Sequence, residues 1–338
     1  MEELAQLSYT AGADVVAQII QKKEKVDPAY FIGRGKAEEL SLLCRKLEAN
    51  LVIFLEDLRP VQERNLTELL NVKVIDRQAL ILDIFAQRAL TKEGKLQVEL
   101  AQLEYLLPRL TGYGIILSRL GGGIGTRGPG ETKLETDRRH IRRRISTLKR
   151  ENEKVRAHRE LLRESRYHRG FKLAALVGYT NTGKSTLLNA LTGAHAFVED
   201  KLFATLDPTV KKVYLGEGKY ILLIDTVGFI KNLPHQLVVA FKATLEEVRQ
   251  ADLILNVMDA SHPKLEEHLE IVDQVLEELA ADNKPMINIL NKIDKVSDKM
   301  KIKELLESIP DSVAISALDK SGFTELFKRI SSVFEQVW

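Results

Sequence analysis

The sequence predicts an α/β protein with three parts: a small N-terminal α/β domain with a parallel sheet, a long antiparallel helical hairpin, and a C-terminal domain with a mostly parallel sheet and helices on both faces. Three observations support this prediction. Strand-like and helix-like stretches alternate in the first 95 residues, leucines then recur at helical spacing, and a glycine-rich loop near residue 180 separates an apolar run from a helical stretch. We expect the three domains to cover residues 1–94, 95–170 and 171–338.

In the N-terminal part, short runs rich in Val, Ile and Leu alternate with stretches of helical periodicity. Such alternation is typical of a parallel sheet flanked by helices. The segment Gly33-Arg34-Gly35-Lys36 lacks the rest of a phosphate-binding pattern, so we interpret it as a tight turn. The expected strands are residues 15–20, 51–54 and 72–75, and the expected helices are residues 36–47, 60–70 and 77–89.

Two leucine-rich segments in the middle of the chain predict the hairpin, because their apolar residues form one stripe along each helix. Pro108 is expected to kink the first helix, since it removes a backbone hydrogen bond. Between the helices, residues 121–130 contain six glycines and predict a flexible tip. We interpret the tip as a probe for nucleic acid or phosphate, with a plain linker as the alternative. The stripes consist of Leu96, Leu100, Leu103, Leu107 and Leu110, and of Leu134, Ile141, Ile145, Leu148, Val155 and Leu162.

The second helix is strongly basic in a chain that is nearly neutral. Residues 133–172 contain 15 Lys and Arg against 6 Asp and Glu, whereas the whole chain has a net charge of +2. This arginine density favours neutralisation of phosphates, and hence nucleic-acid binding that weakens steeply with salt. The alternative is a solvated face with ordinary ion pairs along the helix. Five arginines face mostly away from the apolar stripe: Arg138, Arg139, Arg142, Arg143 and Arg144.

Composition excludes several classes of protein. With 44% hydrophobic and 29% charged residues, the chain is typical of globular proteins and not of disordered or membrane proteins. No apolar stretch approaches the length that spans a bilayer, and residues 1–12 lack the basic start and apolar core of a secretory signal. The single cysteine, Cys44, excludes an intramolecular disulfide and a cysteine metal cluster. We therefore expect a cytoplasmic protein without a membrane span. Separately, we expect a monomer.

The most informative motif is a glycine-rich loop of eight residues. An apolar run at residues 171–177 precedes it and a helical stretch at residues 185–191 follows it, which is the context that a phosphate-binding loop requires. Backbone N–H groups would surround the phosphates, Lys184 would reach the β and γ phosphates, and Ser185 would hold Mg²⁺. The alternative is an ordinary glycine-rich turn. The loop consists of Gly178, Tyr179, Thr180, Asn181, Thr182, Gly183, Lys184 and Ser185.

A second motif follows the strand predicted at residues 220–224. It consists of Asp225, Thr226, Val227 and Gly228. The aspartate suits the coordination shell of Mg²⁺, and the glycine N–H suits a contact to the γ phosphate. The next residue is Phe229, where Ras-like enzymes have the glutamine that orients the attacking water. We therefore expect the protein by itself to hydrolyse its bound nucleotide slowly, and a partner to accelerate this hydrolysis.

A third motif follows the strand predicted at residues 285–290 and selects the base. Asp294 can accept hydrogen bonds from N1–H and the exocyclic amine of guanine, whereas adenine would leave this acceptor facing a lone pair. Lys292 would lie along the base plane. The motif consists of Asn291, Lys292, Ile293 and Asp294. After the next strand, a backbone N–H in Ser316, Ala317 and Leu318 would support the guanine carbonyl, with an ordinary turn as the alternative.

The segment between the first two motifs contains two candidate threonines. A threonine in this segment completes the coordination of Mg²⁺ when a γ phosphate is bound. Spacing does not choose between Thr205 and Thr209, and Thr209 has an alternative role in capping the turn after Pro208.

Residues 171–335 resemble the five-part signature of the translation-factor-like P-loop GTPases, and the whole chain resembles the HflX family of ribosome-associated GTPases. The motifs that carry the second resemblance are residues 31–36, 97–103, 121–132, 134–139, 202–209 and 225–230. This resemblance implies a C-terminal P-loop GTPase domain with GTP or GDP and Mg²⁺ as cofactors. It also implies binding to the large (50S) ribosomal subunit, contacts of the N-terminal part with ribosomal RNA, and the splitting or rescue of stalled ribosomes under stress.

The resemblance also assigns individual residues by position. It implies catalytic roles for Lys184, Thr205 and Gly228, and it favours Thr205 over Thr209 for Mg²⁺. The alternative function is a GTPase switch that regulates a protein partner through the hairpin without direct RNA binding. The nucleotide contacts carried over are Gly178, Tyr179, Thr180, Asn181, Thr182, Gly183, Lys184, Ser185, Phe203, Ala204, Thr205, Leu206, Asp207, Asp225, Thr226, Val227, Gly228, Asn291, Lys292, Ile293, Asp294, Ser316, Ala317 and Leu318, with Ser185 and Thr205 on Mg²⁺.

Overall fold

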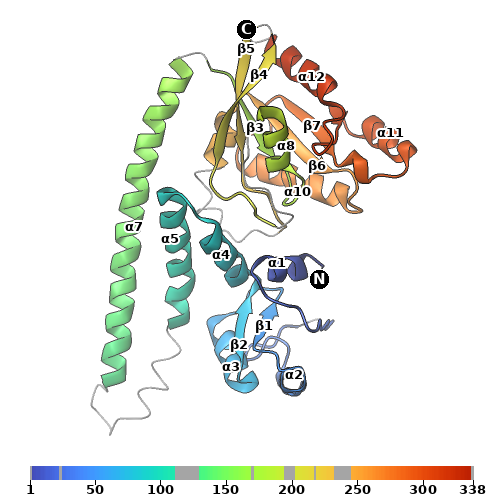
Figure 1. Cartoon of the computed structure of the whole chain (residues 1–338). Coiled ribbons are helices and arrows are strands. Elements are labelled where there is room, and N and C mark those ends of the chain that lie inside the picture. The colour runs from blue at the N-terminus through green and yellow to red at the C-terminus, as the bar shows by residue number, and fades with distance from the viewer. Residues whose placement is uncertain are drawn as a thin grey trace. The chain divides into compact units, whose positions relative to one another are not determined.

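A computed structural model describes residues 2–22, 25–110, 129–168, 171–193, 202–216, 218–231 and 245–335 (Figure 1). Most of the predicted glycine-rich tip, residues 121–128, lies outside this range. The chain forms two compact units. The first contains Met1–Gln87 and Lys95–Glu153, and the second contains Arg88–Gly94 and Lys154–Trp338. The domain boundaries expected from the sequence stay predictions.

The first unit contains a two-stranded parallel sheet. Leu51 lies opposite Lys73 and Phe54 opposite Asp76 in the register. The core beside the sheet is formed by apolar side chains of the strands and of the helices at residues 34–46 and 60–70, among them Ala37, Leu66 and Val74. The elements are α1 (Glu2–Thr10), α2 (Arg34–Lys46), β1 (Leu51–Phe54), α3 (Pro60–Leu70), β2 (Lys73–Asp76) and α4 (Arg77–Arg88). The predicted strands and helices from residue 36 onward are therefore confirmed to within two residues.

The strand predicted at residues 15–20 is wrong. This segment has no regular secondary structure and pairs with no strand of the described chain. Val15, Val16, Ile19 and Ile20 are 39–72% exposed, so their apolar pattern is not matched by burial. β-branched residues favour strands mainly because they pack well against a sheet, and no sheet of the described residues covers them here.

The predicted helical hairpin is confirmed by α5 (Lys92–Arg109) and α7 (Pro129–His168), which run side by side in opposite directions in Figure 1. Leu96, Leu100 and Leu148 of the predicted stripes are buried. Ion pairs join the helices, among them Arg144 to Glu99 at 2.7 Å and Lys149 to Glu104 at 2.8 Å. Pro108 is the next-to-last residue of α5, where the loss of one hydrogen bond costs little.

The second unit contains a six-stranded sheet in the order β4-β5-β3-β6-β7-β8. All neighbouring strands are parallel except β4, which is antiparallel to β5 at one edge. The mostly parallel sheet of the prediction is thereby confirmed. The strands are β3 (Leu173–Val177), β4 (Thr209–Gly216), β5 (Lys219–Asp225), β6 (Leu253–Asp259), β7 (Met286–Asn291) and β8 (Ser312–Ala314).

Helices cover both faces of this sheet. Leu187 of α8 (Lys184–Thr192) and Leu326 of α12 (Phe323–Glu335) belong to the core on one face. Leu265 of α10 (Leu265–Glu278) and Leu305 of α11 (Lys299–Ser308) pack into the core that contains Met258 and Leu290. The motifs found in the sequence follow the carboxyl ends of β3, β5 and β7, which is the edge where parallel α/β sheets bind ligands. Within the described part of the chain, no helix combines the length and apolarity needed to cross a bilayer.

Candidate functional site

The loop of residues 178–185 connects β3 to α8 in a conformation that depends on glycine. Gly178 and Gly183 have φ angles of 141° and 93°, which residues other than glycine rarely adopt. A Cβ atom on Gly178 would also overlap the Val257 carbonyl oxygen, and one on Gly183 would overlap the Asn291 side-chain amide. The loop therefore lies directly against β6 and β7, and its backbone is free to curl around an anion ahead of the helix N-terminus.

Lys184 is the buried cation of this loop. Its side chain is 6% exposed, and Nζ donates to the carbonyl oxygens of Gly178 at 3.1 Å and Tyr179 at 2.7 Å. Burial lowers the pKa of the Lys184 ammonium to about 8, against the opposing effect of Asp225. An anion in the loop would restore the stability of the charged form.

Three side-chain oxygens meet beside the loop. The Ser185 hydroxyl lies 2.6 Å from the Thr205 hydroxyl and 2.6 Å from Asp225 Oδ2, and Thr205 Oγ1 donates to the same Oδ2 at 3.0 Å. Asp225 is 1% exposed, and its other oxygen, Oδ1, has no hydrogen-bond partner among the residues that the structure describes. Burial raises the pKa of the Asp225 carboxyl, although the hydrogen bonds from Ser185 and Thr205 oppose this.

This oxygen cluster suits a hard cation. Two hydroxyls and one carboxylate are the ligand types that Mg²⁺ accepts beside substrate phosphates and water. The unpaired Asp225 Oδ1 is a buried acceptor for which a ligated water would be a donor. No group of three or more His, Cys, Asp or Glu side chains in the described ranges could hold a metal by itself. The hydroxyls are therefore essential to any cation site here.

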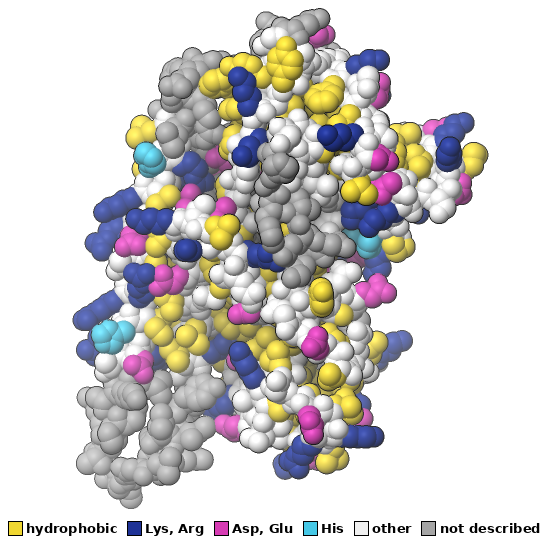
Figure 2. All heavy atoms as spheres, viewed as in Figure 1, with side chains coloured by type: hydrophobic (Ala, Val, Ile, Leu, Met, Phe, Trp, Pro, Cys, Tyr) yellow, Lys and Arg dark blue, Asp and Glu magenta, His cyan; other side chains and the backbone are white. Residues whose placement is uncertain are grey.

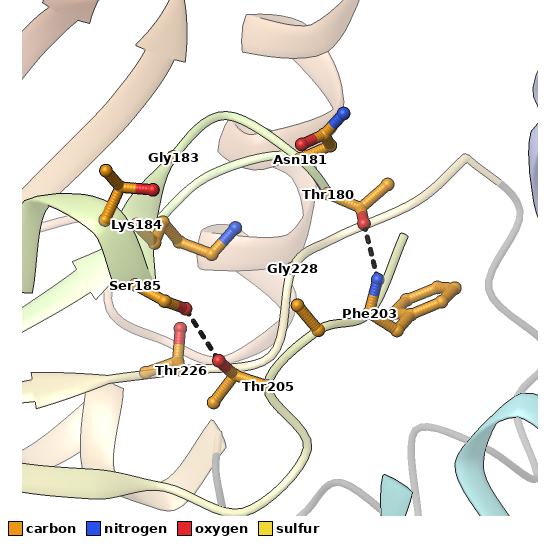
Figure 3. A pocket seen from close by; sticks show the side chains of 11 residues that line it. Thr180, Asn181, Gly183, Lys184, Ser185, Phe203, Thr205, Thr226 and Gly228 are labelled. Atoms are coloured by element: carbon orange, nitrogen blue, oxygen red, sulfur yellow. Dashed lines mark hydrogen bonds between the residues drawn. The ribbon is translucent and has the colours of Figure 1, made fainter. Parts of the chain in front are cut away.

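The segment of residues 202–209 approaches the loop from the other side. The Phe203 N–H donates to Thr180 Oγ1 at 3.0 Å, and Phe203 is buried with a φ of 55°. In Figure 3, Ser185 and Thr205 point toward one another on one side of the cleft, and Thr180 points toward the Phe203 backbone on the other. Thr209, the other candidate of the sequence analysis, is the first residue of β4.

Residues 225–229 lie directly against the loop of residues 178–185. A Cβ atom on Gly228 would lie 2.6 Å from Thr180 Cα, so only glycine allows this approach. The Phe229 N–H donates to the Gly178 carbonyl at 3.0 Å, and the Phe229 carbonyl accepts from the Thr180 N–H at 2.8 Å. Phe229 is 4% exposed, so its ring packs inside the protein. The backbone of this segment and the loop thus form one hydrogen-bonded layer.

The residues after β7 support the far end of the loop. Asn291 Nδ2 donates to the Thr182 carbonyl at 2.8 Å, and Asn291 Oδ1 accepts from the Ala317 N–H at 3.0 Å. Lys292 Nζ donates to the Asn181 carbonyl at 2.7 Å and pairs with Asp259 at 2.7 Å. Asp294 is exposed, which leaves its carboxylate accessible to a base. Buried Ser316 and exposed Leu318 flank Ala317 in the adjoining turn.

The structure brings most of the residues predicted in the loop 178–185, the segment 203–207 and the motif 225–228 to one cleft. Two residues were missed. Thr186 lines the cleft beside Ser185 but carries no motif signal of its own. Asp259 holds Lys292, and the apolar run of β6 that it terminates would have identified it as a neighbour of the β7 motif. The cleft is lined by Thr180, Asn181, Gly183, Lys184, Ser185, Thr186, Phe203, Ala204, Thr205, Thr226 and Gly228.

This combination of sheet, loop and strand-end motifs defines the class of P-loop GTPases. Family models agree along the chain. The N-terminal region of GTP-binding GTPases matches residues 1–86, their middle region matches residues 88–166, and the model described as "50S ribosome-binding GTPase" matches residues 173–292. The chain belongs to the HflX family of GTPases, and it is a GTP-hydrolysing enzyme.

Two relatives and one solved structure illustrate the similarity. The GTPase HflX of Caldanaerobacter subterraneus subsp. tengcongensis is 53% identical over 334 residues, which cover 98% of this chain and 76% of that protein. The GTPase HflX of Escherichia coli (strain K12) is 46% identical over 332 residues, with 98% and 78% covered. A GTP-binding protein from Sulfolobus solfataricus, solved in complex with GDP, is 28% identical with a TM-score of 0.54, covering 100% of this chain and 96% of that one.

Proposed function

We propose that this GTPase binds the large ribosomal subunit through contacts of its N-terminal domain and basic hairpin with ribosomal RNA, and that it splits or rescues stalled ribosomes under stress. The family description as a 50S ribosome-binding GTPase supports the partner. In this proposal the protein acts as a monomer in the cytoplasm, where the ribosomes are.

The observation that carries the RNA contact is an unpaired row of arginines on α7. Arg139, Arg142 and Arg143 are exposed, and none of them has a carboxylate within ion-pair distance in the part of the chain that the structure describes. The neighbouring Arg144, in contrast, pairs with Glu99. Figure 2 shows dark-blue Lys and Arg side chains gathered along the edge where α7 lies in Figure 1. Unpaired guanidinium groups are suited to bind backbone phosphates, and the release of counterions would favour binding.

The nucleotide is bound by the loop and by the base motif. Backbone N–H groups of residues 178–185 bind the phosphates, and Lys184 turns from its carbonyl partners to the β and γ phosphates. Asp294 accepts from the guanine N1–H and amine, while Lys292 covers the base plane. The Gly183 overlap and the Asn291 hydrogen bonds support this arrangement, because they hold the loop beside the base motif.

Ser185 and Thr205 would hold Mg²⁺, and Asp225 would accept hydrogen bonds from water bound to the ion. The three oxygens within 3.0 Å of one another and the unpaired Asp225 Oδ1 support this assignment. When bound, the ion neutralises charge on the β and γ phosphates. Thr205 would exchange its present hydrogen bonds for the ion only when a γ phosphate is present, and would thereby distinguish GTP from GDP.

Hydrolysis by the isolated protein is slow. The Gly228 N–H stabilises charge on the γ phosphate, but the buried Phe229 ring has no group that could orient water. Its backbone is already used by the loop, with both its N–H and its carbonyl hydrogen-bonded. A partner must therefore supply or order the missing group, and the ribosomal subunit is the proposed partner.

Sedimentation with 30S, 50S and 70S particles tests this function. We expect co-sedimentation with 50S in the presence of a non-hydrolysable GTP analogue, weaker binding with GDP, and a steep loss with rising salt. Reversing Arg139, Arg142 and Arg143 to Glu should abolish binding. The matched control reverses Lys299, Lys301 and Lys303 on α11, which are equally exposed, and should leave binding unchanged.

The result also separates the alternative function. A switch directed at a protein partner would tolerate charge reversal on α7 and would bind no ribosomal particle at low salt. Either observation would contradict the proposal. Turnover of GTP measured with and without 50S particles tests the proposed stimulation in the same preparation.

A further inference from the structure

Asp207 connects the nucleotide site to the first turn of α5. Its carboxylate accepts hydrogen bonds from the Leu90 N–H at 2.9 Å, the Thr91 N–H at 2.8 Å and the Thr91 hydroxyl at 2.5 Å. Thr91 directly precedes α5, and its hydroxyl oxygen accepts from the Gly94 N–H at 3.0 Å, as an N-cap residue does. Residues 88–94 belong to the same compact unit as the GTPase sheet, so these contacts lie within one unit.

Gly94 gives independent evidence for this contact. It lies inside the first turn of α5 with an ordinary helical backbone, where alanine would favour the helix by about 1 kcal/mol. A Cβ atom at this position, however, would overlap Asp207 Oδ1. The overlapping atom is the end of a flexible side chain, so Asp207 and not the helix would move. A glycine at this position is therefore explained by the presence of Asp207.

The two ends of this connection are firmly held. On the helix side, Glu93 forms an ion pair with Arg159 of α7. On the nucleotide side, Thr205 lies 2.6 Å from Ser185 and donates to Asp225. Only Leu206 stands between Thr205 and Asp207, and it is 6% exposed. A shift of Asp207 is therefore transmitted to Thr205 through one intervening residue.

We infer that Asp207 is a positioning residue for Thr205, which it keeps at the nucleotide by hydrogen bonds to the start of α5. The inference rests on the proposed role of Thr205 toward Mg²⁺. Energetic coupling between the nucleotide site and the start of α5 acts equally in both directions. GTP binding therefore also stabilises the start of α5. Any ligand that displaces this turn weakens the selective binding of GTP. α5 continues as one helix into the hairpin. The Asp207 contact therefore holds both the first helix of the hairpin and Thr205, the residue proposed to respond to the γ phosphate.

The decisive experiment compares two glycine substitutions in first turns of helices. Gly94→Ala adds a methyl group at the Asp207 contact, whereas Gly35→Ala adds one in the first turn of α2, where no atom of the described residues lies within 4 Å of it. The readout is the ratio of affinities for a fluorescent non-hydrolysable GTP analogue and fluorescent GDP in Mg²⁺ buffer. We expect Gly94→Ala to lower this ratio roughly fivefold to tenfold, on the scale of one or two lost hydrogen bonds, without a lower melting temperature. Gly35→Ala should leave the ratio unchanged.

Substitutions of the hydrogen-bonding partners complete the test. Asp207→Ala and Thr91→Ala should each lower the ratio, their double substitution should add little, and Thr91→Ser should restore it. In EDTA all variants should bind both nucleotides alike. An unchanged ratio in Gly94→Ala and Asp207→Ala would overturn the inference.

Thr205→Ala distinguishes this failure from failure of the proposed function. If Thr205→Ala lowers the ratio while the Asp207 and Gly94 variants do not, Thr205 senses the γ phosphate without help from α5, and only the inference is wrong. If Thr205→Ala itself leaves the ratio unchanged, the proposed role of Thr205 is wrong and the inference is lost with it.

Discussion

Two buried aspartates occupy equivalent places in the two units and have opposite surroundings. Asp76 ends β2 in the first unit and is fully buried, and Asp225 ends β5 in the second and is 1% exposed. Each is the last residue of a strand with a parallel neighbour, at the sheet edge where ligands commonly bind. Burial and position therefore do not distinguish them.

The hydrogen-bond donors around Asp76 saturate its carboxylate. It accepts from the Leu58 and Ala79 N–H groups, from the Tyr105 hydroxyl at 2.9 Å and from Arg109 at 2.9 Å. Arg109 in turn pairs with Glu63 at 2.7 Å. These donors join β2 to α5, and none of them can leave without exposing a buried charge. Asp76 is thus a structural anchor.

Asp225 accepts from two hydroxyls, and its other oxygen is unpaired within the described part of the chain. Hydroxyls can rotate to other partners at small cost, whereas backbone N–H groups and a guanidinium cannot. The comparison shows that the kind of donor and the unpaired oxygen, more than burial, distinguish a ligand site from an anchor.

The largest expected effect comes from the matched substitutions Asp76→Asn and Asp225→Asn. Asp76→Asn should lower the free energy of unfolding of the first unit by about 3–5 kcal/mol, because it leaves Arg109 without its buried counter-charge. Asp225→Asn should not lower stability. The pKa of Asp225 is raised by burial, so its favourable contribution exists below its unfolded pKa and is lost as pH rises through the higher folded value. At neutral pH the carboxylate is destabilising, and asparagine removes that cost.

Chemical denaturation and nucleotide titration of both variants check this contrast. Asp225→Asn should lose Mg²⁺-dependent nucleotide affinity, and Asp76→Asn should keep it as long as the protein is folded. Equal destabilisation by the two substitutions would end the distinction between anchor and ligand site.

The second effect concerns the cation opposite Asp225. Lys184→Ala should weaken GDP binding roughly 100-fold, since it removes charge-assisted contacts to the phosphates. It should not destabilise the nucleotide-free protein, because a buried ammonium is removed with it. Lys303→Ala, on an exposed helix face, is the control and should change neither property. A loss of stability without a loss of affinity would make Lys184 an anchor like Asp76.

Features of the fold and of the nucleotide site are predictable from the sequence when the residues that form them are close together in the chain. The loop 178–185 and the motifs 225–228 and 291–294 are each contiguous, and parallel strands bring their carboxyl ends together, so the sequence predicts both the fold and the location of the cleft. The apolar stripes predict the hairpin for the same reason, because their pattern is local.

Long-range partners were not predictable. Asp207 and Thr91 are 116 residues apart, and no local pattern indicates that they meet. Arg109 and Asp76 meet through tertiary packing in the same way. The apolar run at residues 15–20 shows the opposite failure, because its strand-like pattern is real but the described chain offers it no neighbouring strand.

A third prediction concerns the effect of pH on Lys184 in the nucleotide site. The pKa of Lys184 is about 8 in the nucleotide-free protein, and bound phosphates would raise it. Nucleotide affinity should therefore be constant below pH 7 and fall about tenfold by pH 9. The stability of the nucleotide-free protein should change in the other direction. Because the folded pKa is lowered, keeping the ammonium charged is costly below pH 8, and the free energy of unfolding should rise between pH 8 and 10.5. Isothermal titration and denaturant unfolding across this range measure both slopes, and a flat affinity profile would contradict the assignment.

The smallest change is expected from the loss of one hydrogen-bond donor to Asp76. Tyr105→Phe removes one of the donors to Asp76 and should lower the free energy of unfolding by about 1 kcal/mol, with no change in nucleotide affinity. Burial raises the pKa of the Tyr105 phenol, as does the charge of Asp76, so the hydroxyl stays protonated and donates throughout the neutral range. Tyr214→Phe is the control, because that side chain is 63% exposed and water replaces its contact. If Tyr105→Phe changes nothing, the remaining donors alone saturate Asp76. If it instead alters nucleotide affinity, the anchor of the first unit and the nucleotide site are energetically coupled, and the two aspartates do not act independently.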